Sequence, residues 1–66
     1  MDNSIGSNAR KIRILKGIKQ SHIALKLGYK SPSSLNDIEM GRRQLKADKI
    51  PLLADALGVE IHDLFR

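Results

Sequence analysis

The 66-residue chain has no cysteine and no tryptophan, and it has only one tyrosine and one phenylalanine. Without cysteine, neither a disulfide framework nor a thiolate metal site can form, which favours an intracellular protein. No apolar run approaches the ~18 residues that a membrane-spanning helix needs, and the N-terminus has no signal-peptide core. We therefore expect a soluble, cytoplasmic protein with no membrane association.

The residue groupings of catalysis and cofactor binding are missing too. The two histidines, His22 and His62, have no carboxylate spaced with them as an acid–base or metal-ligand set. The five glycines are scattered and form no phosphate-binding loop. We expect no enzymatic activity, no catalytic or metal-ligating residue and no cofactor. Since no ligand domain follows, we also expect no small-molecule ligand.

Positive charge predominates and is segregated along the chain. Residues 1–49 contain eleven lysines and arginines against four acids, a balance of +7, whereas residues 50–66 have a balance of −2. A chain of this length folds as one small domain that buries only ~60% of its unfolded surface and has no deep pocket. The segregation favours a phosphate-binding face with a separate packing or partner face. The alternative is a charged surface that serves solubility alone.

The sequence predicts helices throughout, because its apolar residues recur at helical spacing and never alternate as in a strand. The first helix runs to about Lys16 and is closed by Gly17. Its expected N-cap is Ser7 or Asn8, unless the helix begins as early as Ser4.

Two further helices are predicted near the end of the chain. Asp48 is expected to cap a fourth helix that ends at Gly58. Pro51 would occupy the third position of this helix, where its missing N–H costs little. A short last helix, including Leu64 and Phe65, then closes the core.

The second and third helices form a pair joined by a tight turn. One ends at Gly28, and Ser31 with Pro32 begins the other. Ala24 is small enough to let the two helices cross closely at a steep angle, the arrangement that pushes a helix into a DNA groove. We expect a helix-turn-helix unit at about residues 19–41 within a single domain of residues 1–66.

The order and spacing of several short motifs resemble the Cro/C1-type helix-turn-helix family of phage repressors and bacterial xenobiotic-response-element regulators. The matching pieces are Ile5-Gly6, Arg13, GIKQ from Gly17 to Gln20, Ala24, LGY from Leu27 to Tyr29, Ile38-Glu39, Gly41, and ADALGVEIHDLF from Ala54 to Phe65. The resemblance implies a five-helix, lambda-repressor-like domain whose third helix enters the major groove. In one departure, the interval from Gly28 to Glu39 is a residue longer than in the family's commonest form, which predicts a wider turn before Ser31.

Polar residues occupy the outer face of the third helix, where base contacts are expected. The candidates are Ser33, Ser34, Asn36, Asp37 and Met40. Asparagine can pair with adenine, serine with several base edges, aspartate with the cytosine amino group and methionine with the thymine methyl group. The carboxylate of Asp37 is unfavourable near phosphates unless a specific donor meets it, and the alternative role for Asp37 is to exclude wrong sequences. The alternative for each residue is a solvated helix surface.

A second set of residues is expected to contact phosphates. Its members are Lys19, Gln20, Lys30, Ser31, Arg42, Arg43 and Lys46. Gln20 opens the second helix, where free N–H groups and the helix dipole attract an anion, and the resemblance implies this use of a glutamine. The alternative is an ordinary first-turn residue.

Two charges occupy positions that turn toward the core. Arg13 lies four residues after Ala9, and Glu39 lies four residues after Leu35. Because a buried charge needs a partner, we expect an ion pair between them, and the resemblance implies the same. The pair would fix the third helix against the first. The alternative is two unconnected surface charges.

The sequence thus predicts a homodimeric, sequence-specific transcriptional regulator, a repressor of phage, plasmid or mobile-element type in a bacterium. One module covers only about 600–1,000 Å² of DNA, so we expect two copies on an inverted-repeat operator in double-stranded DNA. The expected dimer surface consists of Leu52, Ala56, Ile61 and Phe65. The alternative is a protein-interaction or antitoxin module, for which outward aliphatic residues such as Ile14 and Leu25 would form the contact surface.

Overall fold

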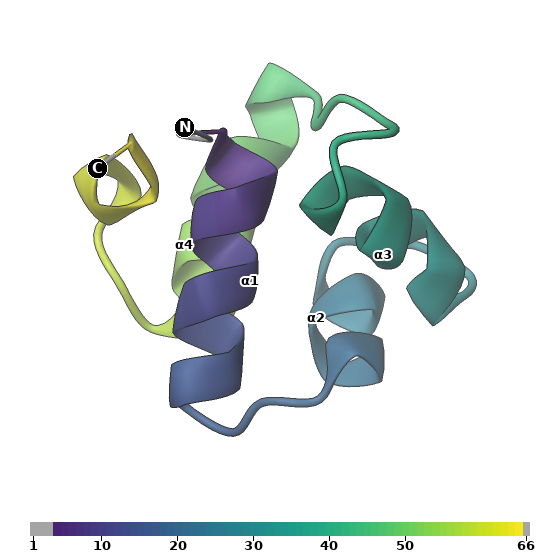
Figure 1. Cartoon of the computed structure of the whole chain (residues 1–66), viewed down its shortest axis with the longest axis horizontal. Coiled ribbons are helices and arrows are strands. Elements are labelled where there is room, and N and C mark those ends of the chain that lie inside the picture. The colour runs from purple at the N-terminus through teal and green to yellow at the C-terminus, as the bar shows by residue number, and fades with distance from the viewer. Residues whose placement is uncertain (1–3, 66) are drawn as a thin grey trace.

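The computed structural model describes residues 4–65, and the regular structure in this part of the chain is entirely helical (Figure 1). In chain order the elements are α1 (Ile5–Leu15), α2 (Gln20–Lys26), α3 (Pro32–Glu39), the 3-10 turn η1 (Ala47–Lys49), α4 (Ile50–Leu57) and the 3-10 helix η2 (Ile61–Phe65). The predicted all-helical fold is confirmed, and the predicted last helix is the 3-10 helix η2. None of the helices in residues 4–65 is both long and apolar enough to cross a membrane.

Helices α1 and α4 form the middle of the molecule, with η2 on one side and the α2–α3 pair on the other (Figure 1). Helix α3 packs against both α1 and α2, while α2 also packs against α4. The inner face of α3 is therefore covered by two helices.

Every α-helix and η2 contribute to one core. Its buried members are Ala9, Ile23, Ala24, Leu27, Leu35, Leu53, Ala54, Leu57 and Leu64. Ala24, which is 2% exposed, is the small residue predicted between α2 and α3. Truncating one of the buried leucines to alanine would cost about 2–5 kcal/mol, because the cavity left behind adds to the lost burial.

The predicted helix terminators Gly28 and Gly58 have φ angles of +84° and +72°, in the left-handed region that strains other residues. At each end the next residue folds back, so that the Tyr29 N–H donates to the Ala24 carbonyl. These bonds satisfy carbonyls that the last helical turn leaves open. The prediction of helix ends from glycine is confirmed at both positions.

Of the starts predicted for the first helix, the early one at Ser4 is observed, and the predicted N-cap of α4 needs correction. Helix α1 begins after Ser4, whose hydroxyl accepts the Ser7 N–H at 3.1 Å. Asn8, one of the expected caps, is buried instead, and its Nδ2 donates to the Leu64 carbonyl at 2.7 Å. Asp48 does not cap α4, because it lies inside η1, which leads directly into the helix, and the residue in the cap position is Lys49.

Candidate nucleic-acid interface

Helix α3 has one face in the core and one face accessible to solvent. Leu35, Ile38 and Glu39 are buried on the inner face. Of the five expected base-reading residues, Ser33 and Met40 are exposed and Ser34, Asn36 and Asp37 are half-buried. The structure thus places four of them on the outer face or the edges of α3 and Met40 directly after its last residue.

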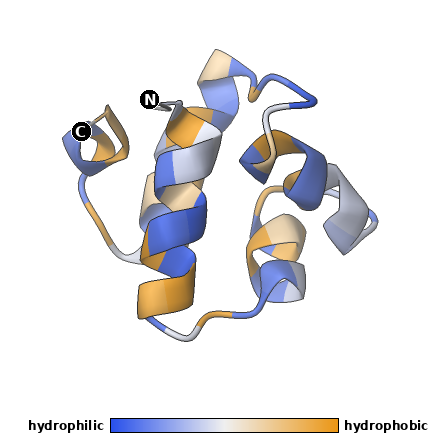
Figure 2. Cartoon of the chain, in the orientation of Figure 1, coloured by the Kyte–Doolittle hydropathy of each residue, from blue (hydrophilic) through white to orange (hydrophobic). Residues whose placement is uncertain are grey.

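The residues expected at phosphates lie before and after this helix. Those that are exposed are Lys19, Lys30, Ser31, Arg42, Arg43 and Lys46. The loop that follows α3 is hydrophilic for most of its length (Figure 2). Exposed cationic side chains therefore precede and follow α3 in the chain.

Arg13 and Glu39 form a two-pronged ion pair between α1 and α3. Arg13 Nε donates to Glu39 Oε2 at 2.8 Å, and Nη2 donates to Oε1 at 3.2 Å. A third bond runs from Arg13 Nη1 to the Ile18 carbonyl at 2.9 Å. Because the Glu39 side chain is only 1% exposed, this pairing compensates a charge that is almost fully removed from water.

Gln20 lies half-buried beside this pair and joins it to the outer side of α3. Its Nε2 donates to Glu39 Oε1 at 3.0 Å and to Asn36 Oδ1 at 3.2 Å. Arg13, Glu39, Gln20 and Asn36 therefore form one network across three helices, which we call the α3 clamp. Sequence reasoning missed these partners of Gln20, because a single amide at a helix start gives no signal of what it bonds.

Asp37 and Arg42 are also linked. Arg42 Nε and Nη2 lie 3.1 and 3.0 Å from Asp37 Oδ1. The backbone N–H groups of Arg42 and Arg43 donate to the Asp37 carbonyl at 2.8 and 3.2 Å. The chain after α3 therefore turns back onto Asp37, a connection that the sequence did not indicate.

Tyr29 holds a second arginine of this loop. The guanidinium carbon of Arg43 lies 5.1 Å from the centre of the tyrosine ring, and Lys49 Nζ lies 5.2 Å from it. Lys49 Nζ also donates to the Leu27 carbonyl at 2.8 Å, near the end of α2. Cation–π contacts thus place Arg43 beside the turn between α2 and α3.

The expected dimer residues lie on α4 and η2, which pack against each other. Leu52, Ile61 and Phe65 are 47%, 44% and 57% exposed, whereas Ala56 is half-buried. These three large apolar side chains lie on elements that do not belong to the helix-turn-helix unit.

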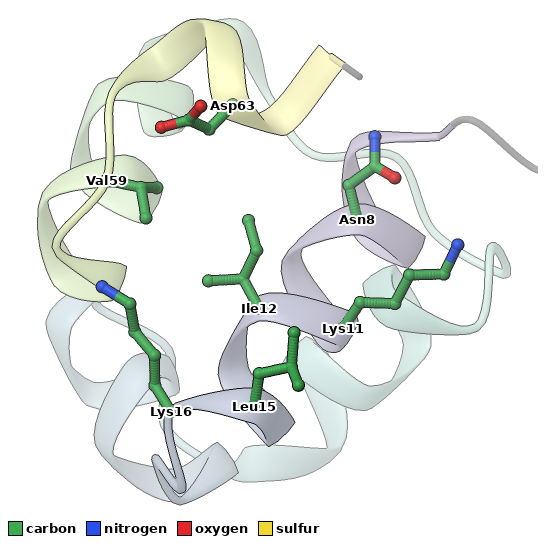
Figure 3. Close-up of a pocket in the computed structure, with 7 residues that line it drawn as sticks. All are labelled: Asn8, Lys11, Ile12, Leu15, Lys16, Val59 and Asp63. Atoms are coloured by element: carbon green, nitrogen blue, oxygen red, sulfur yellow. The ribbon is translucent and has the colours of Figure 1, made fainter.

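A shallow groove of about 410 Å³ lies between α1 and the segment that leads into η2 (Figure 3). Ile12, Leu15 and Val59 provide its apolar lining, with the side chains of Lys11 and Asp63 at its edges. Within residues 4–65 no three His, Cys, Asp or Glu side chains gather as metal ligands. The groove therefore shows apolar surface and no set of reactive groups.

Comparison with known proteins agrees with this geometry. A family model of Cro/C1-type helix-turn-helix domains matches residues 10–64. No significant match is found among curated protein sequences.

Three solved structures are similar over most of the chain. The restriction-modification controller protein C.AhdI from Aeromonas hydrophila is 33% identical, with 92% of this chain and 91% of that chain covered and a TM-score of 0.82. The clp gene regulator ClgR from C. glutamicum is 26% identical, with 94% and 79% covered and a TM-score of 0.83. The hypothetical transcription factor NHTF from Neisseria is 27% identical, with 94% and 70% covered and a TM-score of 0.79.

Proposed function

The chain belongs to the Cro/C1-type helix-turn-helix family of DNA-binding transcription regulators, and we propose that it acts as a homodimeric repressor on an inverted-repeat operator. The observation that carries this proposal is the setting of α3. The α3 clamp holds the helix from its inner side, while its outer face is polar and flanked by cations. A helix held in this way, with polar side chains on its outer face, can read base edges in the major groove.

Base reading is assigned to the five outer residues of α3. Asn36 is held in place by Gln20, which donates to its Oδ1, and its Nδ2 is left to donate to a base acceptor. Ser33 and Ser34 suit several base edges, and Met40 suits a thymine methyl group. Gln20 contributes by holding Asn36. Because both hydrogens of its Nε2 are used by Asn36 and Glu39, its proposed phosphate contact is assigned to its backbone N–H at the start of α2.

Affinity is assigned mainly to the basic residues around α3. Exposed lysines and arginines release counterions when they neutralise phosphates, so binding should weaken steeply with salt, with a log–log slope of about −0.9 per contact. These contacts position the protein and carry little sequence information. The proposed set is Lys19, Gln20, Lys30, Ser31, Arg42, Arg43 and Lys46.

Dimerisation is assigned to α4 and η2. Their exposed Leu52, Ile61 and Phe65, together with Ala56, lie in the section of the chain that has a net negative charge, and this surface therefore suits a partner protein better than DNA. Two copies would place their α3 helices in major grooves about 34–36 Å apart, one helical turn of DNA. An operator with two-fold symmetry follows from this arrangement.

The biological setting that we propose is a mobile genetic system. Support comes from the similarity to C.AhdI, a restriction-modification controller protein, since the similarity covers 91% of the C.AhdI chain. A small repressor that controls a restriction-modification or similar mobile gene set fits both this likeness and the basic α3 surface.

The test is selection of bound duplexes from random DNA at fixed salt, since one experiment reports binding, half-site, spacing and symmetry. We expect an inverted repeat to be enriched, and we expect binding to be lost when Arg42 and Arg43 are both changed to alanine. The control changes Arg10 and Lys11 of α1, removing the same charge from exposed positions outside the helix-turn-helix unit. Equal binding by the two double variants would contradict the proposal.

A protein-interaction or antitoxin module is the second candidate, because Leu15 and Leu25 are 86% and 75% exposed. Aliphatic side chains so open to water favour a contact surface when they adjoin one another. For this candidate we expect that no DNA sequence is enriched and that the Arg42 and Arg43 substitutions leave binding to the partner protein unchanged. The same selection experiment therefore separates the two functions.

A further inference from the structure

The side chain of Arg42 is held by Asp37 along one edge only. Arg42 Nε and Nη2 both lie within 3.1 Å of Asp37 Oδ1, so the carboxylate occupies the side of the guanidinium group. The opposite edge, formed by Nη1 and the second hydrogen of Nη2, remains available. An arginine in this state presents two parallel N–H donors in a fixed direction.

The backbone reinforces this arrangement. The N–H groups of Arg42 and Arg43 both donate to the Asp37 carbonyl, at 2.8 and 3.2 Å, so the start of the loop is bonded to the last turn of α3. Gly41 permits the reversal, since its φ is +81°. Arg42 is thus tied to one residue of the reading helix by both its main chain and its side chain.

The ion pair contributes little to folding. The two side chains are 59% and 45% exposed, and exposed pairs contribute only ~0.2–1 kcal/mol. The pair does fix the direction of the Arg42 guanidinium group, because a free arginine side chain samples many rotamers and the carboxylate restricts them. It also explains the carboxylate itself, which would repel DNA if Arg42 did not neutralise it.

We propose that Arg42 reads a guanine in the operator and that Asp37 is the residue that positions it. The inference rests on the proposed DNA-binding function. Guanine presents two acceptors, O6 and N7, in the major groove at the spacing of an arginine fork, whereas adenine replaces one of them with an amino donor. Arg42 thereby becomes a base-reading residue, and not only one of the phosphate contacts assigned above.

The test compares positions within the selected operator. The full chain is first used to select its preferred duplex, and each G·C pair is then changed singly to A·T. Dissociation constants are measured at several salt concentrations for the wild type, Arg42→Ala, Asp37→Ala and Arg43→Ala. Circular dichroism and thermal melting show which variants remain folded.

For the wild type we expect one guanine per half-site whose replacement weakens binding roughly 5- to 150-fold, the range of one bidentate base contact. Arg42→Ala should abolish the preference at that position and leave the other positions unchanged. Asp37→Ala should weaken the preference for guanine at the same operator position. It should also strengthen binding to random DNA, because one negative charge is removed. A merely structural role for Asp37 would lower affinity for all sequences alike.

Arg43→Ala is the matched control and should weaken all duplexes equally, with the salt slope reduced by about 0.9. The same uniform loss in Arg42→Ala would overturn the inference and return Arg42 to the phosphate contacts. A selected half-site without guanine would also overturn it, with the proposed function intact. Absence of salt-dependent DNA binding in the wild type would overturn both.

Discussion

The backbone of Gly6 in α1 lies directly against the carbonyl of Ile38 near the end of α3. A Cβ atom at position 6 would overlap the Ile38 carbonyl oxygen and its carbon. Both partners are backbone atoms, which cannot move aside as a flexible side chain can. Gly6 therefore sets how closely α1 and α3 approach, and with it the position of α3.

Gly6→Ala should destabilise the protein, although alanine normally favours a helix interior over glycine by about 1 kcal/mol. Overpacking of this kind costs about 1–3 kcal/mol, and relief of the overlap would push α3 outward. Urea denaturation measures the first effect, and affinity for the selected operator measures the second. Arg10→Ala, an exposed change in the same helix, is the control and should stay within about 0.5 kcal/mol. A Gly6→Ala protein as stable as the wild type would refute the close contact.

The ion pair of the α3 clamp should show strong coupling in a double-mutant cycle of Arg13→Met and Glu39→Met. Arg13→Met alone leaves a carboxylate that is 1% exposed without its partner, at a cost of about 3–5 kcal/mol. The double variant removes both charges and should cost less than the sum of the two single changes. Free energies of unfolding from urea titration give the coupling. A coupling near zero would mean that the two charges act independently.

Lys16 should stabilise the end of α4 although it belongs to the end of α1. Its Nζ donates to the Leu57 carbonyl at 2.8 Å and to the Gly58 carbonyl at 3.2 Å. A cation at a helix C-terminus contributes about 0.3–1 kcal/mol, so Lys16→Met should lower the free energy of unfolding by that amount. Lys11→Met, at an exposed lysine of α1, is the comparison. Equal stability of the two variants would show that the bonds to α4 contribute nothing.

Phe65→Asp should dissociate the proposed dimer. Phe65 is 57% exposed on η2, and a carboxylate there would have to lose its water in an apolar interface. Sedimentation equilibrium of the wild type and the variant at the same concentration measures the change. Leu25→Asp, at a leucine 75% exposed on α2, should leave the dimer unchanged. Dissociation by Leu25→Asp alone would move the interface to the helix-turn-helix side.

The helices could be predicted from the sequence because glycines mark their ends and apolar residues repeat on one face. Gly28 and Gly58 are local signals that depend on no distant partner. The N-caps were less predictable, since Asn8 and Asp48 are residue types typical of N-caps but occupy other structural positions. Asn8 bonds the distant Leu64 carbonyl, and Asp48 lies inside η1, which replaces a cap.

The candidate site could be predicted in part, where a local sequence pattern marks its residues. The pairing of Arg13 with Glu39 could be predicted because each is a charged residue at an inward-facing helical position. By contrast, periodicity does not reveal the partners of long, flexible side chains. Examples are the hydrogen bonds of Gln20, the bonds of Lys16 to α4 and the ion pair of Arg42 with Asp37. Such contacts depend on the tertiary arrangement, which no local pattern encodes.

The α3 clamp has a consequence for how new binding preferences could arise. It uses the inner face of α3 and Asn36, and neither Ser34 nor Met40 takes part in it. Exchanges at these two proposed base-reading positions should leave the scaffold intact. Ser34 and Met40 are therefore the natural places to randomise in order to direct this regulator to another DNA sequence.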